Sequence, residues 1–176
     1  RTGGGYYGGL GRRGPYERSG LSVGAATKLG VKLKVFGSGS AHNDLVSIAG
    51  PTVDFHTDRF GDASDDAVTE ALNSAKGFIF PTEEDFGIVQ VEALAAGAPV
   101  IAYGKGGTLD IVQDGESGVL FQEQTADAVA AAIEKAEALT FMPATLQRKA
   151  KRFDKSLFIS KMRKVVSDEY SKKEQP

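Results

Sequence analysis

The stretch FPTEEDFGIVQVEALAAGAPV, residues 80–100, spans most of one strand–helix–strand unit. It begins where one short apolar segment, GFIFP (77–81), ends, and it finishes at the start of another, PVIAYG (99–104). Both segments are typical of strands buried inside a sheet. The residues between them leave almost no polar face, which favours a buried helix, and Gly97 followed by a proline ends that helix. The stretch therefore predicts two parallel strands joined by a helix.

The rest of the chain repeats this alternation. Further strands are expected at 31–37, 52–56 and 118–122, and a first strand near 6–10. Helical patterns fill the gaps, and two of them follow suitable N-cap residues, Ser64 and Thr125. The C-terminal forty residues read as helix, with these apolar side chains expected to be buried: Phe141, Leu146, Phe153, Leu157, Phe158, Met162 and Val165. Short strands alternating with helices predict an α/β fold, a doubly wound, Rossmann-like parallel sheet.

Three regions follow from this pattern. Residues 1–24 contain nine glycines, far above the usual share of roughly 7%. We expect a first strand and a phosphate loop there, although a flexible linker would have the same composition. Residues 25–140 form the Rossmann-like domain, and residues 141–176 form C-terminal helices. The chain opens with Arg1, so we expect an excised piece of a larger protein.

The composition excludes several classes of function. The chain has 41% hydrophobic and 25% charged residues and a formal net charge of -2, so nothing suggests a nucleic-acid partner. It has no cysteine, which excludes disulfides and thiolate metal sites, and it has only two histidines. We therefore expect no metal. No apolar run approaches the roughly 20 residues of a transmembrane helix.

Four acidic residues are unusual in the opening stretch. Glu92 lies inside the helix that we expect to be buried, where an unpaired carboxylate would be costly. Either it is paired with a cation, or it faces a polar cleft at the carboxyl edge of the sheet, where ligands of doubly wound folds bind. Glu83, Glu84 and Asp85 precede the helix, and a capping box from Thr82 would explain them structurally as well as a binding site would.

Glu84 and Glu92 are separated by seven residues. Phe-Gly follows shortly after Glu84, and the segment EALAAGAPVIA begins at Glu92. Together with YGKGGTLDIVQDGESGVLF (103–121), this resembles the E-x7-E motif and the following glycine turn of retaining glycosyltransferases of family GT4, in the C-terminal half of the GT-B fold. The resemblance extends over residues 28–170. Within that family, the sequence of these motifs is most similar to that of mannosyltransferase-like members.

The resemblance implies a domain that binds a nucleotide-diphospho-sugar, with GDP-mannose favoured over UDP-sugars and no further cofactor. Glu84 would act at the donor sugar as the catalytic residue, and Glu92 would bind the ribose hydroxyls. A carboxylate accepts hydrogen bonds from two vicinal hydroxyls, and a helix N-terminus attracts anions. The remaining donor-binding residues that it implies are Arg12, Arg18, Gly37, Phe86, Gly87, Ile88, Gly106 and Gly107.

The segment GLGRRGPYER (9–18) departs from the family. Members have an arginine and, five residues later, a lysine that clamp the diphosphate. Arg12 matches the arginine, but the lysine position is Glu17. At about 5 Å and an effective dielectric of about 20, this like charge would cost roughly 3 kcal/mol. Arg18 replaces the lysine only if the loop adjusts. Alternatively, these arginines are solvated surface charges.

The predicted function is thus the donor half of a retaining hexosyltransferase in the cytoplasm or at the inner membrane face. By resemblance, a missing N-terminal half would bind a glycan or lipid acceptor, and the C-terminal helix would cross back to it. The chain alone is then expected to be inactive. The alternatives are a non-catalytic nucleotide-sugar-binding module and a GT-B epimerase. A phosphorylase would need a pyridoxal-binding lysine, for which no context is present.

Overall fold

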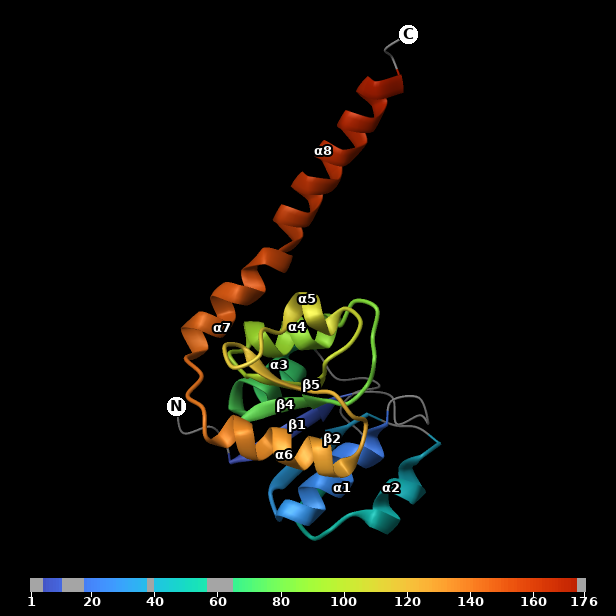
Figure 1. Cartoon of the computed structure of the whole chain (residues 1–176), viewed down its shortest axis with the longest axis vertical. Coiled ribbons are helices and arrows are strands. Elements are labelled where there is room, and N and C mark those ends of the chain that lie inside the picture. The colour runs from blue at the N-terminus through green and yellow to red at the C-terminus, as the bar shows by residue number, and fades with distance from the viewer. Residues whose placement is uncertain (1–4, 11–17, 38–39, 57–64, 174–176) are drawn as a thin grey trace.

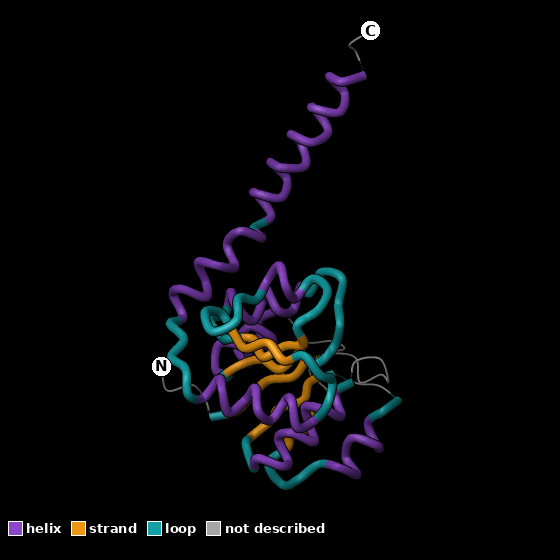
Figure 2. The backbone as a smooth tube through the Cα atoms, in the orientation of Figure 1, coloured by secondary structure: helices purple, strands orange, loops and turns teal. Residues whose placement is uncertain are grey.

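The computed structural model describes residues 5–10, 18–37, 40–56 and 65–173, and it contains one parallel sheet between two layers of helices (Figures 1 and 2). The sheet order is β3-β2-β1-β4-β5-β6. The strands are β1 (Tyr6–Leu10), β2 (Lys32–Phe36), β3 (Val53–His56), β4 (Gly77–Phe80), β5 (Val100–Tyr103) and β6 (Gly118–Phe121). The predicted doubly wound fold and its expected strands are confirmed.

Helices cover both faces of the sheet. One face carries α1 (Ser19–Leu29), α2 (His42–Ile48) and α6 (Ala126–Glu137), and the other carries α3 (Asp65–Ser74), α4 (Ile88–Ala95), α5 (Thr108–Ile111) and α7 (Pro143–Ala150) (Figure 1). A short 3-10 helix, η2 (Lys151–Phe153), leads into α8 (Lys155–Lys173). Every residue of β4 and β5 is buried, because both faces of these strands are covered.

The glycine-rich strand β1 lies at the centre of the sheet, paired with β2 and β4. Its two tyrosines anchor it. The Tyr6 hydroxyl donates to the Ala71 carbonyl oxygen at 2.6 Å, and the Tyr7 hydroxyl donates to Glu137 Oε1 at 3.1 Å. Both rings are buried. Apolar ring area and satisfied hydroxyls therefore offset the weak packing of Gly8 and Gly9.

Two of the expected helix boundaries have clear chemical causes. At the start of α6, the Thr125 hydroxyl accepts a hydrogen bond from the Ala128 amide at 3.1 Å, which confirms this N-cap. After α4, Gly97 has a φ of 81° and donates to the Leu94 carbonyl, while Ala98 donates to Ala93. This pattern is a Schellman motif, which requires the left-handed residue that glycine supplies. The other predicted cap, Ser64, lies outside the described residues.

The prediction of a buried helix after Gly87 is wrong for most of its side chains. Only three side chains of α4 are buried, those of Gln90, Ala93 and Leu94. Ile88 is 62% exposed, and Glu92 is also exposed. Residues four apart lie on the same side of a helix, so both side chains belong to the face that turns away from the sheet. Glu92 is therefore no buried carboxylate, and burial gives no reason to expect a partner or a cleft for it.

The prediction of a buried C-terminal helix is also wrong in its second half. Leu146 is fully buried, and Phe141 and Phe153 are partly buried against the core. Beyond η2, however, α8 projects away from the domain (Figure 1). The apolar side chains that were expected to be buried there are exposed by 44–62%: Leu157, Phe158, Met162 and Val165. Apolar periodicity identified a helix face but not what covers it.

Candidate functional site

The carboxyl edge of the sheet has a cleft between β1 and β4, where the strand order reverses direction. A cavity of about 140 Å³ lies here. Its walls come from the ends of three strands, the first turn of α1 and the loop after β4, and include Gly9, Ser19, Phe36, Phe80, Thr82 and Glu84. Ligands of open α/β sheets bind in this crevice. The position of Glu84 in its wall places one predicted site residue at the expected location.

The acid loop, residues 81–87, connects β4 to α4. Its three acids are exposed, and Gly87 at its end has a φ of 87°. Helix α4 begins only at Ile88, with Gly87 as N-cap, no side-chain cap and no acid in the first turn. The capping box from Thr82, the structural explanation offered for these acids, is therefore wrong. The left-handed Gly87 separates the acids from the helix.

The glycine loop, residues 104–107, follows β5 and packs directly on the acid loop. The Gly107 amide donates to the Glu84 carbonyl oxygen at 2.8 Å. A Cβ on Gly107 would lie 2.4 Å from the Asp85 oxygen, and one on Gly106 would lie 2.5 Å from the Glu84 oxygen. A side chain at either position would therefore collide with the backbone of the acid loop.

The other predicted residues are distributed around this edge. Arg18 is exposed and caps α1 with a φ of 48°, unusual for a residue with a side chain. Gly37 follows β2 with a φ of 108° and is buried. Phe86 is 56% exposed and contacts the Phe153 ring edge-on, with centroids 6.2 Å apart. Arg12 and Glu17 lie outside the described residues.

Sequence reasoning missed one cation at this edge, Lys105, in the glycine loop. Its Nζ lies 5.5 Å from the centre of the Tyr103 ring. Interaction with the Tyr103 phenol, and after it the charge of Glu83, raises the pKa of the Lys105 ammonium. The signal was present in the sequence, because this lysine directly follows an expected strand at its carboxyl end.

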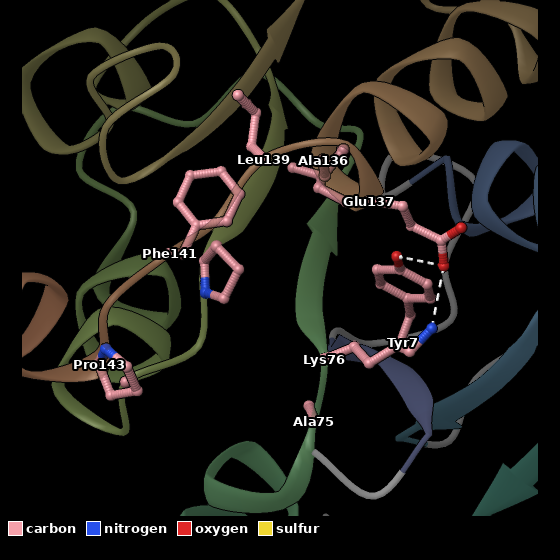
Figure 3. A pocket seen from close by; sticks show the side chains of 11 residues that line it. Tyr7, Ala75, Lys76, Ala136, Glu137, Leu139, Phe141 and Pro143 are labelled. Atoms are coloured by element: carbon pink, nitrogen blue, oxygen red, sulfur yellow. Dashed lines mark hydrogen bonds and ion pairs between the residues drawn. The ribbon is translucent and has the colours of Figure 1, made fainter. Parts of the chain in front are cut away.

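A larger hollow of about 410 Å³ lies at the opposite, amino edge of the sheet (Figure 3). On one wall, Glu137 Oε1 accepts from the Tyr7 hydroxyl at 3.1 Å and from Lys76 Nζ at 3.0 Å, while Phe141 lies across from them. The bond from Lys76 lowers the pKa of Glu137. None of the predicted site residues lines this hollow, and its charged groups pair with each other. The candidate site is therefore the cavity at the carboxyl edge.

Two features are absent from the described part of the chain. No group of three or more His, Cys, Asp or Glu side chains comes together there in a way that could hold a metal ion. No described helix combines the length and the apolar character needed to cross a bilayer.

Comparisons with known proteins agree with this architecture. The profile of the family described as "Glycosyl transferases group 1" matches residues 25–153. No curated protein matches the chain. Among solved structures, the lipopolysaccharide outer core galactosyltransferase WaaB in its apo form superposes with a TM-score of 0.80 at 15% identity, over 93% of this chain and 49% of that chain.

Two further structures are similar. Anabaena Alr3699/HepE in complex with UDP and glucose has a TM-score of 0.75 at 20% identity, over 93% of this chain and 48% of that one. The pneumococcal O-GlcNAc transferase GtfA in complex with UDP and GlcNAc has a TM-score of 0.75 at 19% identity, over 93% and 35%. The chain thus spans about half or less of the length of these proteins. At such identities the likeness establishes the fold.

Proposed function

The chain belongs to the group 1 glycosyl transferases, and we propose that it is the half of such an enzyme that binds the nucleotide-diphospho-sugar donor. The observation that carries this proposal is the cavity at the reversal of strand order, with Glu84 in its wall and the first turn of α1 beside it. A carboxylate accepts hydrogen bonds from sugar hydroxyls, and a helix N-terminus favours the negative diphosphate.

The proposed reaction transfers a hexosyl group with retention of configuration. The bond between the anomeric carbon and the diphosphate oxygen breaks, and its electron pair leaves with the diphosphate. The acceptor oxygen bonds to the anomeric carbon and passes its proton to the departing diphosphate. Developing charge on the diphosphate needs cations and N–H donors aimed at it. We assign that role to Arg12, Arg18 and Lys105. We assign Glu84, with the amides of Gly87 and Ile88, to the sugar, and Glu92 to the ribose.

The donor that we propose first is GDP-mannose, which rests on the sequence resemblance alone. Two of the similar structures are described in complex with UDP, which makes UDP-glucose and UDP-GlcNAc the rivals. The proposal requires a nucleoside diphosphate in either case, because the cleft offers the same helix N-termini to both.

The exposed apolar side chains of α8 support a second part of the proposal. We infer that this helix packs on an N-terminal half of the enzyme, which binds a glycan or lipid acceptor in the cytoplasm or at the inner membrane face. A helix that exposes Phe158 and Val165 by more than half gains stability when another surface covers them. The chain alone is then expected to bind donor but to transfer no sugar.

The test is calorimetric titration of the chain with UDP, GDP, UDP-glucose and GDP-mannose. We expect one nucleotide-sugar to bind, and Glu92→Gln to weaken it roughly tenfold or more, since a hydrogen bond to a charged group contributes about 1.5–3 kcal/mol. Glu134→Gln, an exposed change on α6, is the matched control. Absence of binding to all four compounds would refute a donor site.

Two results would favour the alternatives. Release of an epimerised sugar nucleotide without any acceptor would identify an epimerase. Tighter binding of the nucleoside diphosphate by Glu17→Lys would identify Glu17 as a defect in the clamp and favour a module that binds without catalysis. If Glu17→Lys leaves the affinity unchanged, then Glu17 does not occupy the clamp position.

A further inference from the structure

A buried polar pair joins the helices that follow the acid loop and the glycine loop. Gln90 Nε2 donates a hydrogen bond to Thr108 Oγ1 at 2.9 Å, and both residues are 0% exposed. Gln90 belongs to the first turn of α4, directly after the acid loop, and Thr108 is the first residue of α5, directly after the glycine loop. The pair therefore joins the beginnings of two helices, one of which follows the loop that lines the cavity.

The space around this pair is closely filled. A Cβ on Gly87 would lie 3.0 Å from Gln90 Nε2 and 3.0 Å from Ile111 Cδ1. The Gln90 amide thus packs against the backbone at the left-handed turn that ends the acid loop. The two loops also contact each other directly, because the Gly107 amide donates to the Glu84 carbonyl. One backbone bond and one side-chain bond therefore hold the two loops together.

Fold stability alone is a poor explanation for this pair. Gln90 Oε1 is buried, and no described residue donates a hydrogen bond to it. A buried polar atom without a partner is costly, whereas a leucine or methionine would fill similar space without that cost. Buried polar pairs of this kind restrict the geometry of the elements that they join. Here those elements carry the acid loop and the glycine loop.

We propose that Gln90 and Thr108 are positioning residues for the donor sugar. By joining α4 to α5, they hold the acid loop in the one arrangement that presents Glu84 and the first amides of α4 to the sugar. Two of the three cations that we assign to the diphosphate, Arg12 and Arg18, precede α1 in the chain and not α4 or α5, so we expect diphosphate binding to depend less on this pair. The inference rests on the proposed function and adds which side chains fix the conformation of the acid loop.

The test compares two ligands on the same variants. Thr108→Val keeps the shape of the side chain and removes the acceptor, and Gln90→Met removes the donor. Affinities are measured for UDP and UDP-glucose, and for GDP and GDP-mannose. We expect each variant to lose roughly tenfold in the affinity for the nucleotide-sugar relative to its diphosphate, because the loop shifts, while the affinity for the diphosphate changes less than about threefold. Thr145→Val on α7 is the matched control.

An equal loss for both ligands would indicate general destabilisation and overturn the proposal, as would an unchanged ratio. A second measurement does not depend on the donor. Amide hydrogen exchange in residues 82–90 should accelerate about tenfold in Thr108→Val, with α6 unaffected; unchanged exchange overturns the proposal. If the wild-type chain binds none of the four ligands, the proposed function fails, and the exchange experiment still decides whether the pair holds the loops.

Discussion

Replacing Gly107 by alanine tests whether contact between the two loops sets the site. The backbone at Gly107 has φ -61° and ψ -17°, which alanine adopts without strain. The added methyl group, however, would lie 2.4 Å from the Asp85 carbonyl oxygen and 2.7 Å from that of Phe86. Both are backbone atoms, so no side chain can rotate to make room. The substitution therefore pushes the two loops apart.

The expected magnitude follows from these distances. Non-bonded heavy atoms prefer a separation of about 3.5 Å, so the acid loop must retreat by roughly 1 Å. Such overpacking costs about 1–3 kcal/mol, which urea unfolding of Gly107→Ala should reveal as a lower midpoint. The hydrogen bond from Gly107 to the Glu84 carbonyl would also lengthen or break. Because a displacement of about 1 Å at a site can cost about 100-fold, nucleotide-sugar affinity should fall by at least tenfold.

Gly20→Ala in α1 is the control, because its methyl group would meet Ile48 and Leu45 at an ordinary 3.8 Å. We expect that variant to be as stable as the wild type or more stable by up to about 1 kcal/mol. If Gly107→Ala unfolds at the wild-type urea concentration and binds the donor unchanged, the loops are not held by this contact, and the reasoning is refuted.

Three further predictions concern the fold. Thr125→Ala should lower the free energy of unfolding by about 1 kcal/mol, because the Ala128 amide loses its cap; Thr145→Ala, which caps no helix, should cost less in the same urea titration. Leu146→Ala, in the core, should cost about 2–5 kcal/mol, whereas Leu157→Ala on the exposed α8 should change stability by less than about 0.5 kcal/mol, and equal effects would contradict the separation of α8 from the domain. The pKa of Glu137 is lowered in the folded chain, so its stabilising contribution is present above its unfolded pKa of 4.5 and is lost as the pH falls through the lower folded value. Glu137→Gln should thus be less stable than the wild type at pH 7, by no more than about 1 kcal/mol for so exposed a pair, and the difference should vanish in unfolding curves recorded well below pH 4.5.

Local patterns predicted the sheet well. Apolar runs such as GFIFP and PVIAYG identified strands that are buried on both faces. Helices cover both faces of this parallel sheet, so its central strands are continuous apolar runs. The same reasoning failed for α4 and α8, because it inferred burial from apolar content alone. Exposure of Ile88 and Phe158 depends on which surface is present to cover them, and no local pattern contains that information.

The features around the candidate site were likewise predicted only in part. The sequence by itself determined the strands and the Gly97 helix end, because periodicity and caps are properties of short segments. Only the tertiary structure decided that Gly107 is pressed against the acid loop and that Gln90 meets Thr108. Those contacts join segments about twenty residues apart, across two neighbouring strands. Their geometry is set by strand order and helix packing, which arise only when the whole sheet has formed.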